Sequence, residues 1–345
     1  MNYFDYNFVL IFWRGVMNKK ALFTFAAVLC AGSQLYAEDA PEKVTQAQSP
    51  WEFSATTSAA YYPEVEHDRG STHIAGISGP YDGIKAVTEL DAAYTLPFLR
   101  GNDGFTADNH VTFNMGLEIS PVTVAPVASI TVSPIAFLEL AIGGTAGTGW
   151  NAFGLFQGMA EYNEAKPEYK DMTPFANWYL YGWASACLMF DLAALWEGDW
   201  HHVVATATYK AGYQKLTGTD SDVWLWQASD GLASGWVYEQ EYFVGYQMPL
   251  KLSMVGIGTT LSGHYQSSDF GEYSSSYKGD FMTIDIWPMA EITLGKKDKL
   301  YVLFDFQSRR SFHEKYKDSE YEPLMTYSGR EWIFYSLGFQ WKHLF

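Results

Sequence analysis

Ser262 and His264 are the two side chains in this sequence whose types and spacing could support catalysis. In a strand, residues i and i+2 project from one face, so the hydroxyl and the imidazole share a side. A histidine beside a serine can act as the base that activates a nucleophile. However, no Gly-x-Ser-x-Gly motif is present, and no third residue can be assigned to orient the histidine. We therefore expect a polar wall pair and no enzyme.

Carboxylates form a second candidate site, because many of them share one face of alternating segments. Lys85 and Lys210 share that face. Enclosed in a barrel, such carboxylates would favour cations. The alternative is that they form paired, water-bridged networks inside a narrow, closed barrel. The acidic residues expected to line the lumen are Glu89, Asp91, Glu118, Glu139, Glu239, Glu241, Asp285, Glu291 and Asp305.

The remaining ligand-type residues predict no metal site and no cofactor. His201 and His202 are adjacent, so on a strand they point to opposite faces and chelate poorly. Cys187 has no cysteine partner once the N-terminal segment containing Cys30 is removed. The acidic loop 148–173 could bind calcium or fold inward as a constriction, but a solvated loop is the simpler expectation.

The element that would position these residues is a β-strand with unlike faces. In 111–119, Val111, Phe113 and Met115 share one face with Leu117 and Ile119, while polar residues and glycine occupy the other. The same period of two recurs along the chain, including an apolar face of Ile333, Tyr335, Leu337, Phe339 and Trp341 near its end. About twelve such strands are expected. They lie near 51–62, 84–97, 108–120, 122–133, 135–147, 174–190, 201–214, 235–248, 251–266, 280–294, 299–310 and 330–345.

The polar face separates a membrane barrel from a soluble one. In a soluble barrel the polar face would meet water outside and should be rich in Lys and Glu. The polar face of this chain instead holds Gly, Ser, Thr, Asn and Gln. Trp178, Trp236 and Trp341 fall near strand ends on the apolar face, where an aromatic girdle would lie. Connections alternate between short turns and long polar loops, as in bacterial outer-membrane barrels. We therefore predict a closed, all-β antiparallel transmembrane barrel over 51–345, with periplasmic turns and extracellular loops.

Composition agrees with this class and excludes another. Charged residues make up 18% of the 345 residues, against about 25% in average soluble domains. Residues 1–37 carry Arg14, Lys19, Lys20 and Asp5, a net charge of +2, so the formal charge of −17 leaves −19 on the remainder. Such an acidic chain repels phosphate backbones, and we expect no nucleic-acid partner.

A targeting segment precedes the strands. Met17-Asn18-Lys19-Lys20 is a short basic start, and an apolar run follows from Ala21 to Ala31. This pattern predicts a signal peptide over 1–37, with the true start at Met17 and cleavage after Ala37. The apolar run is too short to span a bilayer as a helix. Residues 38–50 would then form a short periplasmic tail.

The last eight residues, 338–345, resemble the C-terminal strand signal of bacterial outer-membrane β-barrels. Gly338 is followed by Phe339 and Trp341, and the chain ends on Phe345. The resemblance implies recognition by the barrel-assembly machinery and location in the outer membrane. His343 departs from the pattern, because an apolar or aromatic residue is usual there, and the spacing from Gly338 is longer than in the commonest version.

Three functions are compatible with such a barrel, and a porin-like passive channel for small hydrophilic solutes is the leading expectation. An acidic lumen would make this channel cation-favouring. The alternatives are an outer-membrane lipid-modifying enzyme and a structural or surface-interaction barrel with no open pore. Loop aromatics such as Trp224, Trp226 and Tyr273 would serve sugar stacking or partner binding equally well. The sequence leaves the solute, the openness of the lumen and the oligomeric state undetermined.

The predicted cleavage gives a direct measurement. Mass spectrometry of the exported protein is expected to find Glu38 as the first residue, because the small side chain of Ala37 fits a signal-peptidase site. A mature chain that retained residues upstream of Glu38 would contradict the prediction.

Overall fold

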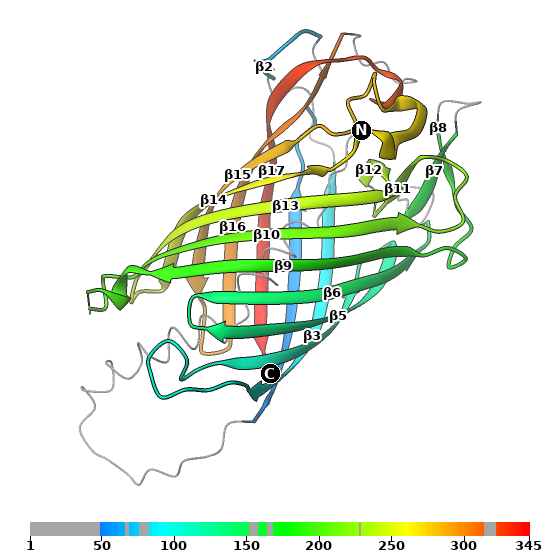
Figure 1. The fold of residues 1–345 in the computed structure, drawn as a ribbon. Helices are drawn as coiled ribbons and strands as arrows, with labels where there is room; N and C mark the ends of the chain where they lie inside the picture. The colour runs from blue at the N-terminus through cyan, green and yellow to red at the C-terminus, as the bar shows by residue number, and fades with distance from the viewer. Residues whose placement is uncertain are drawn as a thin grey trace.

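The fold is a closed antiparallel barrel of twelve strands, which confirms the predicted class (Figure 1). The computed structural model describes residues 49–65, 69–75, 83–151, 158–163, 168–196, 198–227, 229–313 and 322–345. The described residues contain no helix of the length and apolarity that a membrane crossing requires. The barrel strands are β1 (Trp51–Tyr61), β3 (Ile84–Pro97), β4 (His110–Ile119), β5 (Thr123–Ile135), β6 (Leu138–Gly149), β9 (Tyr179–Asp191), β10 (Val203–Leu216), β13 (Gly235–Gln247), β14 (Leu252–His264), β15 (Thr283–Thr293), β16 (Asp298–Phe312) and β17 (Tyr327–Leu344).

The barrel closes where its first and last strands meet. β1 pairs with β17 in an antiparallel register that runs from Ser54 opposite Leu344 to Tyr61 opposite Leu337. Each other barrel strand pairs with its neighbours in chain order. Because the sheet has no free edge, its backbone N–H and C=O groups are satisfied within the wall, as a bilayer crossing requires.

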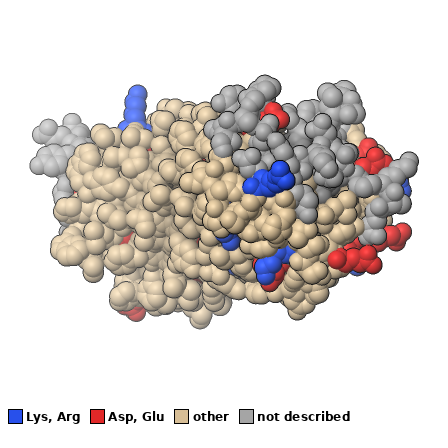
Figure 2. Space-filling model, turned by 90° about the horizontal axis from the view of Figure 1, so that it is seen from above, with Lys and Arg blue, Asp and Glu red and all other residues tan. Residues whose placement is uncertain are grey.

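Side chains alternate between an apolar exterior and a polar interior. On β4, for example, Phe113 and Met115 are exposed while His110, Thr112 and Glu118 are buried. Exposed apolar residues recur at mid-strand on most of the wall, for instance Ile130, Ile142, Leu188, Val244, Ile257 and Phe304. In the view of Figure 2 most of the surface carries no charge, and most of the charged side chains lie towards one end. An uncharged apolar wall around a polar interior is the geometry of an outer-membrane barrel.

One stretch of the last strand differs from the predicted alternation. Ile333 and Tyr335 are buried, although the sequence pattern places them on the apolar exterior with Phe339 and Trp341. The cause is a β-bulge, because Asp305 pairs with Ser336 but Phe306 pairs with Phe334, which leaves Tyr335 without an opposite residue. An extra residue shifts the alternation by one, so the interior positions are odd-numbered above the bulge and even-numbered below it.

The two ends of the barrel differ, as predicted. Turns at the end that holds the C-terminus include the two-residue link 136–137 and the four-residue links 248–251 and 294–297. The opposite end carries the long connections and five further elements: β2 (His73–Ile74), β7 (Met159–Asn163), β8 (Glu168–Asp171), β11 (Val223–Trp226) and β12 (Ser229–Ala233). The described residues also include three short 3-10 helices: η2 (Leu192–Ala194), η3 (Ser267–Tyr273) and η4 (Glu322–Leu324).

The longest short-side connection, 98–109, is held by one carboxylate. Oδ1 of Asp103 accepts hydrogen bonds from the N–H groups of Phe105 and Thr106, each at 2.9 Å. These contacts lower the pKa of Asp103, and the hydrogen bond from Phe105 has the largest effect. The charged form therefore stabilises the turn at neutral pH, and this contribution is lost as the pH falls through the lowered pKa.

This linkage predicts a titration that NMR can follow. The amide proton shifts of Phe105 and Thr106 are expected to change with a midpoint below about 4, the ordinary aspartate value. In Asp103→Asn the acceptor remains but cannot titrate, so the pH-dependent change should vanish. Shifts that titrate alike in both proteins would contradict the assignment.

Candidate functional site

A row of polar side chains crosses the interior wall in register. Glu139 on β6 pairs with Cys187 on β9, which pairs with Thr208 on β10 and then with Glu241 on β13. The row continues from Glu241 through Thr260 on β14 to Asp285 on β15 and Gln307 on β16. Nε2 of Gln307 donates to Oδ1 of Asp285 at 2.8 Å. We call these seven residues the lumen row.

The carboxylates of the lumen row are buried, which differs from a water-lined channel wall. Glu139, Glu241 and Asp285 are 4%, 3% and 3% exposed. Oε2 of Glu139 and Oε1 of Glu241 have no hydrogen-bond partner among the described residues. An acceptor in that position is able to bind a cation or a hydrogen-bond donor that enters the interior.

Basic side chains neutralise part of this acidity. Nζ of Lys210 lies 2.8 Å from Oε1 of Glu239, and the same ammonium lies 5.7 Å from the ring centroid of Trp183. Nζ of Lys299 lies 2.7 Å from Oε1 of Glu291. Lys299 could have been assigned to the interior from the sequence, because it shares the parity of Asp305 on the same strand.

The other predicted lumen residues also lie on the inward side of their strands. Glu89, Glu118, Glu291 and Asp305 are buried, while Asp91, Glu239 and Lys85 are half-buried. They do not gather at one point. Glu118 and Lys85 lie near the long-loop end, whereas Glu291 lies near the short-turn end.

Long loops fold into a second sheet at one mouth of the barrel. The order of this sheet is β12–β11–β7–β8, and we call it the loop sheet. It is built from the two connections 150–178 and 217–234, which lie on either side of β9 and β10. Inward folding of the acidic loop, an alternative left open by the sequence, thus occurs for Met159–Asn163.

The loop sheet contacts the inner wall at several points around the mouth. Nζ of Lys85 on β3 lies 3.4 Å from Oγ of Ser229. Nε2 of Gln227, just after β11, donates to Oγ1 of Thr123 at 2.9 Å and also to Glu118. Because β3, β4 and β5 all hold it by hydrogen bonds, the sheet lies across the opening.

Aromatic packing fixes the loop sheet from the facing strands. The ring of Trp226 stacks on Tyr179 of β9 with centroids 4.9 Å apart. A Cβ at Gly147 on β6 would lie 2.6 Å from the Trp226 ring, so only glycine permits this approach. Trp224 and Trp226 are 0% and 1% exposed, and Tyr273 is also buried. The expectation that these three serve sugar stacking or partner binding is therefore wrong, since they form a core beneath the loops.

An apolar cluster narrows the interior nearer the short turns. The rings of Phe243 and Trp287 stack with centroids 5.6 Å apart, and Met254, Met289, Tyr301 and Leu303 pack around them. Both rings lie over glycines of β14, because Cβ atoms at Gly256 and Gly258 would clash with them. The rings thus cover wall positions that carry no side chain.

Ser262 and His264 share the interior face, but no hydrogen bond joins them in the described structure. Nδ1 of His264 lies 2.9 Å from Oδ2 of Asp269, and its Nε2 lies 3.4 Å from Nε2 of Gln214. The imidazole is therefore held by a carboxylate and an amide, and neither of its nitrogens faces the serine hydroxyl. Among the described residues no group of three or more His, Cys, Asp or Glu is arranged to hold a metal ion.

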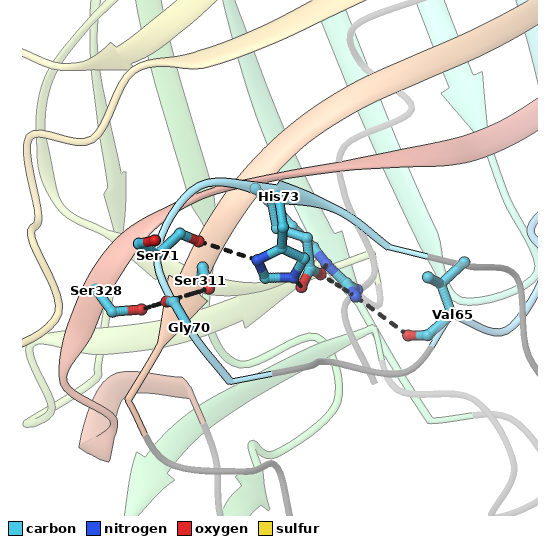
Figure 3. Close-up of polar contacts among 8 residues, drawn as sticks. Val65, Gly70, Ser71, His73, Ser311 and Ser328 are labelled. Atoms are coloured by element: carbon cyan, nitrogen blue, oxygen red, sulfur yellow. Dashed lines mark hydrogen bonds and ion pairs between the residues drawn. The ribbon is translucent and has the colours of Figure 1, made fainter.

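Sequence reasoning missed a buried ion pair above the barrel (Figure 3). Nη2 and Nε of Arg309 each lie 2.5 Å from Oε1 of Glu331, on adjacent strands of the β16–β17 hairpin. Oε2 of Glu331 lies 2.6 Å from Nε2 of His73, whose strand β2 pairs in parallel with β17. The parity of Arg309 and Asp305 could have indicated this cation, but its partner lies beyond the bulge.

The same segment is held by a second set of contacts. Gly70 O accepts hydrogen bonds from Ser311 Oγ at 2.9 Å and from Ser328 Oγ, while Nδ1 of His73 lies 2.9 Å from the carbonyl of Ser71. Arg309 also donates to the carbonyl of Val65 at 3.3 Å. Both members of the ion pair thus also bind the first long connection and hold it onto the last hairpin.

Comparison with known proteins finds similarity at the level of structure. No protein-family model matches the chain, and no curated protein sequence matches it. An outer-membrane channel from Pseudomonas putida F1 is 10% identical with a TM-score of 0.46, covering 89% of this chain and 100% of the channel. The β domain of the Bordetella autotransporter BrkA is 10% identical (TM-score 0.42, 86% and 99%). The NanC porin is 6% identical (TM-score 0.36, 84% and 97%). The closed strand ring and apolar exterior of the chain itself are what place it in a bacterial outer membrane.

The Lys210–Glu239 pair gives a test of the interior. Removing one partner of a buried pair leaves an uncompensated charge, which costs about 3–5 kcal/mol. Lys210→Met should therefore destabilise the barrel, measured by urea unfolding in lipid vesicles. The double variant Lys210→Met/Glu239→Gln should recover much of the loss. If Lys210→Met unfolds at the same urea concentration as the wild type, the pair does not stabilise the fold.

Proposed function

We propose that this outer-membrane barrel is a passive channel for small hydrophilic solutes, which favours cations and is closed by its own loop sheet in the described conformation. The lumen row supports the proposal most directly. It aligns carboxylates from three strands along the inner wall, from Glu139 near the short turns to Asp285 near the long connections, with unsatisfied oxygens on Glu139 and Glu241. Carboxylates that line a passage lower the energy of a cation within it.

The filled interior accounts for the burial of that row. Twelve strands leave room for a modest pore, but side chains and inserted loops can fill it. Here the mouth is spanned by the loop sheet, and the Phe243–Trp287 stack narrows the lower interior. Displacing the loop sheet would expose Lys85, Glu118 and the polar wall below them to solvent.

In the proposed channel the Ser262 hydroxyl has no catalytic role. His264 is engaged by Asp269, and this arrangement orients the imidazole away from serine activation. We accordingly propose that the chain is not a lipid hydrolase. Ser262→Ala should leave conductance unchanged, and a phospholipase activity lost in that variant would contradict the proposal.

The terminal aromatic residues fit the proposed recognition by the barrel-assembly machinery. Phe339, Trp341 and Phe345 are exposed, and Gly338 lies half-buried between β1 and β16. The three aromatic side chains lie on the outer side of the wall, where an assembly factor can reach them before the barrel closes.

Cation preference is tested by planar-bilayer recordings in a salt gradient. The wild type should show a cation-to-anion permeability ratio above one. In Glu139→Gln/Glu241→Gln this ratio should fall several-fold, towards one. The control is Glu168→Gln, which removes an exposed acid of β8. Equal ratios in the wild type and the double variant would reject the lumen row as the source of selectivity.

Closure is tested by removing one contact between the loop sheet and the barrel wall. Trp226→Ala deletes the stack on Tyr179, so the loop sheet should leave the mouth more often and the open probability should rise. The matched control is Trp236→Ala, which removes an exposed tryptophan from the outer wall. An open probability that is the same in both variants would show that the loop sheet does not close the channel.

A further inference from the structure

A polar side chain lies on the lipid-facing wall at mid-strand. Gln240 is flanked on β13 by Glu239 and Glu241, which face the interior, so it points outward. The OH of the next outward residue, Tyr242, donates to Oε1 of Gln240 at 3.0 Å. Gln240 lies four residues below the exposed Trp236, which corresponds to roughly 9 Å of depth at 3.3 Å per residue and 45° tilt.

The amide nitrogen of Gln240 is the unusual group at this depth. A primary amide has two N–H donors, and hydrocarbon tails offer no acceptor. No described residue accepts a hydrogen bond from its Nε2. Polar residues in the lipid belt are costly, and they are characteristically found where a protein partner satisfies them.

Other hydroxyl groups surround Gln240 on the same outer face. Tyr209 lies directly opposite it on β10, and the hydroxyl of Tyr209 bonds to that of Tyr265. The ring of Tyr238 packs edge-on against Tyr265, with centroids 5.2 Å apart. Together with Tyr242, these residues make a patch that both donates and accepts hydrogen bonds.

A surface of small side chains adjoins the patch. It occupies the lipid-facing positions of β9 and β10 and consists of Gly182, Ala184, Ala186, Ala205, Ala207 and Ala211. Small residues let another wall approach closely, which increases van der Waals contact within a membrane. On β9 the bulkier exposed Leu180 and Leu188 lie on either side of this small-residue surface.

We propose that this face of β9, β10 and β13 is the contact surface between two copies of the chain in the membrane. A two-fold dimer brings the same patch against itself, so the patch must be self-complementary. Amide and phenol groups meet that condition because each carries a donor and an acceptor. Lipid tails offer neither group, and the exposed Trp236 marks the girdle above which headgroups are expected. Gln240 then donates to a carbonyl or hydroxyl oxygen of the second copy.

The test uses the full chain, purified and reconstituted in phosphatidylcholine vesicles at a series of lipid-to-protein ratios. Single-molecule photobleaching of labelled protein counts copies per particle. The wild type should dimerise, and Gln240→Leu should raise the dimer dissociation constant about tenfold, since two symmetric hydrogen bonds are lost. The matched control is Thr57→Val, a lipid-facing change on β1 whose hydroxyl bonds to Thr88 at 3.1 Å.

A second variant separates association from folding. Ala207→Leu fills the small-residue surface and should abolish dimers while the barrel still migrates as a folded species on unheated gels. A wild type that is monomeric at every ratio would overturn the proposal. So would equal dissociation constants for Gln240→Leu and Thr57→Val, or native mass spectra in which the wild type, but not Gln240→Leu, carries a lipid or another protein in place of a second copy.

Discussion

Closure of the sheet by the β1–β17 pairing is the constraint on which the rest of the structure depends. In hydrocarbon each unpaired backbone group costs several kcal/mol, so a spanning sheet is stable only as a ring. Closing the ring fixes one interior and one exterior for every strand. The polar face of each segment is thereby enclosed, and its apolar face, with Phe113 and Ile142 among many, meets lipid.

Enclosure also determines the chemistry of the interior. Side chains that would be solvated on a soluble sheet must here find partners on neighbouring strands, as Lys210 does with Glu239 and Gln307 with Asp285. The remaining space is filled by the Phe243–Trp287 stack and the loop sheet. In the proposed channel, selectivity and closure are thus properties of the same filled interior, since any passage requires these groups to move.

The loops above the barrel are organised by burial as much as by solvation. Trp224 and Trp226 lie beneath the loops, and Glu331, which pairs with Arg309, anchors β2 to the last hairpin through His73. On the outer wall, in contrast, Gln240 presents an amide to the lipid belt. The chain therefore places apolar groups inside its mouth and a polar group outside its wall, and both reversals have structural consequences.

By itself the sequence determined the strands, their order and the inward side of residues such as Glu139 and Glu241, because alternation with a period of two is a local property of each segment. The tertiary structure alone decided three things. The bulge at Tyr335 reversed the faces of Ile333 and Tyr335, because one extra residue changes parity. The loop aromatics Trp224 and Trp226 became a buried core of the loop sheet, because β7 and β11 pair across more than fifty residues. The two partners of Glu331 were also decided there: the hairpin register beyond the bulge places Arg309 opposite it, and the pairing of β2 with β17 brings His73 from a distant part of the chain.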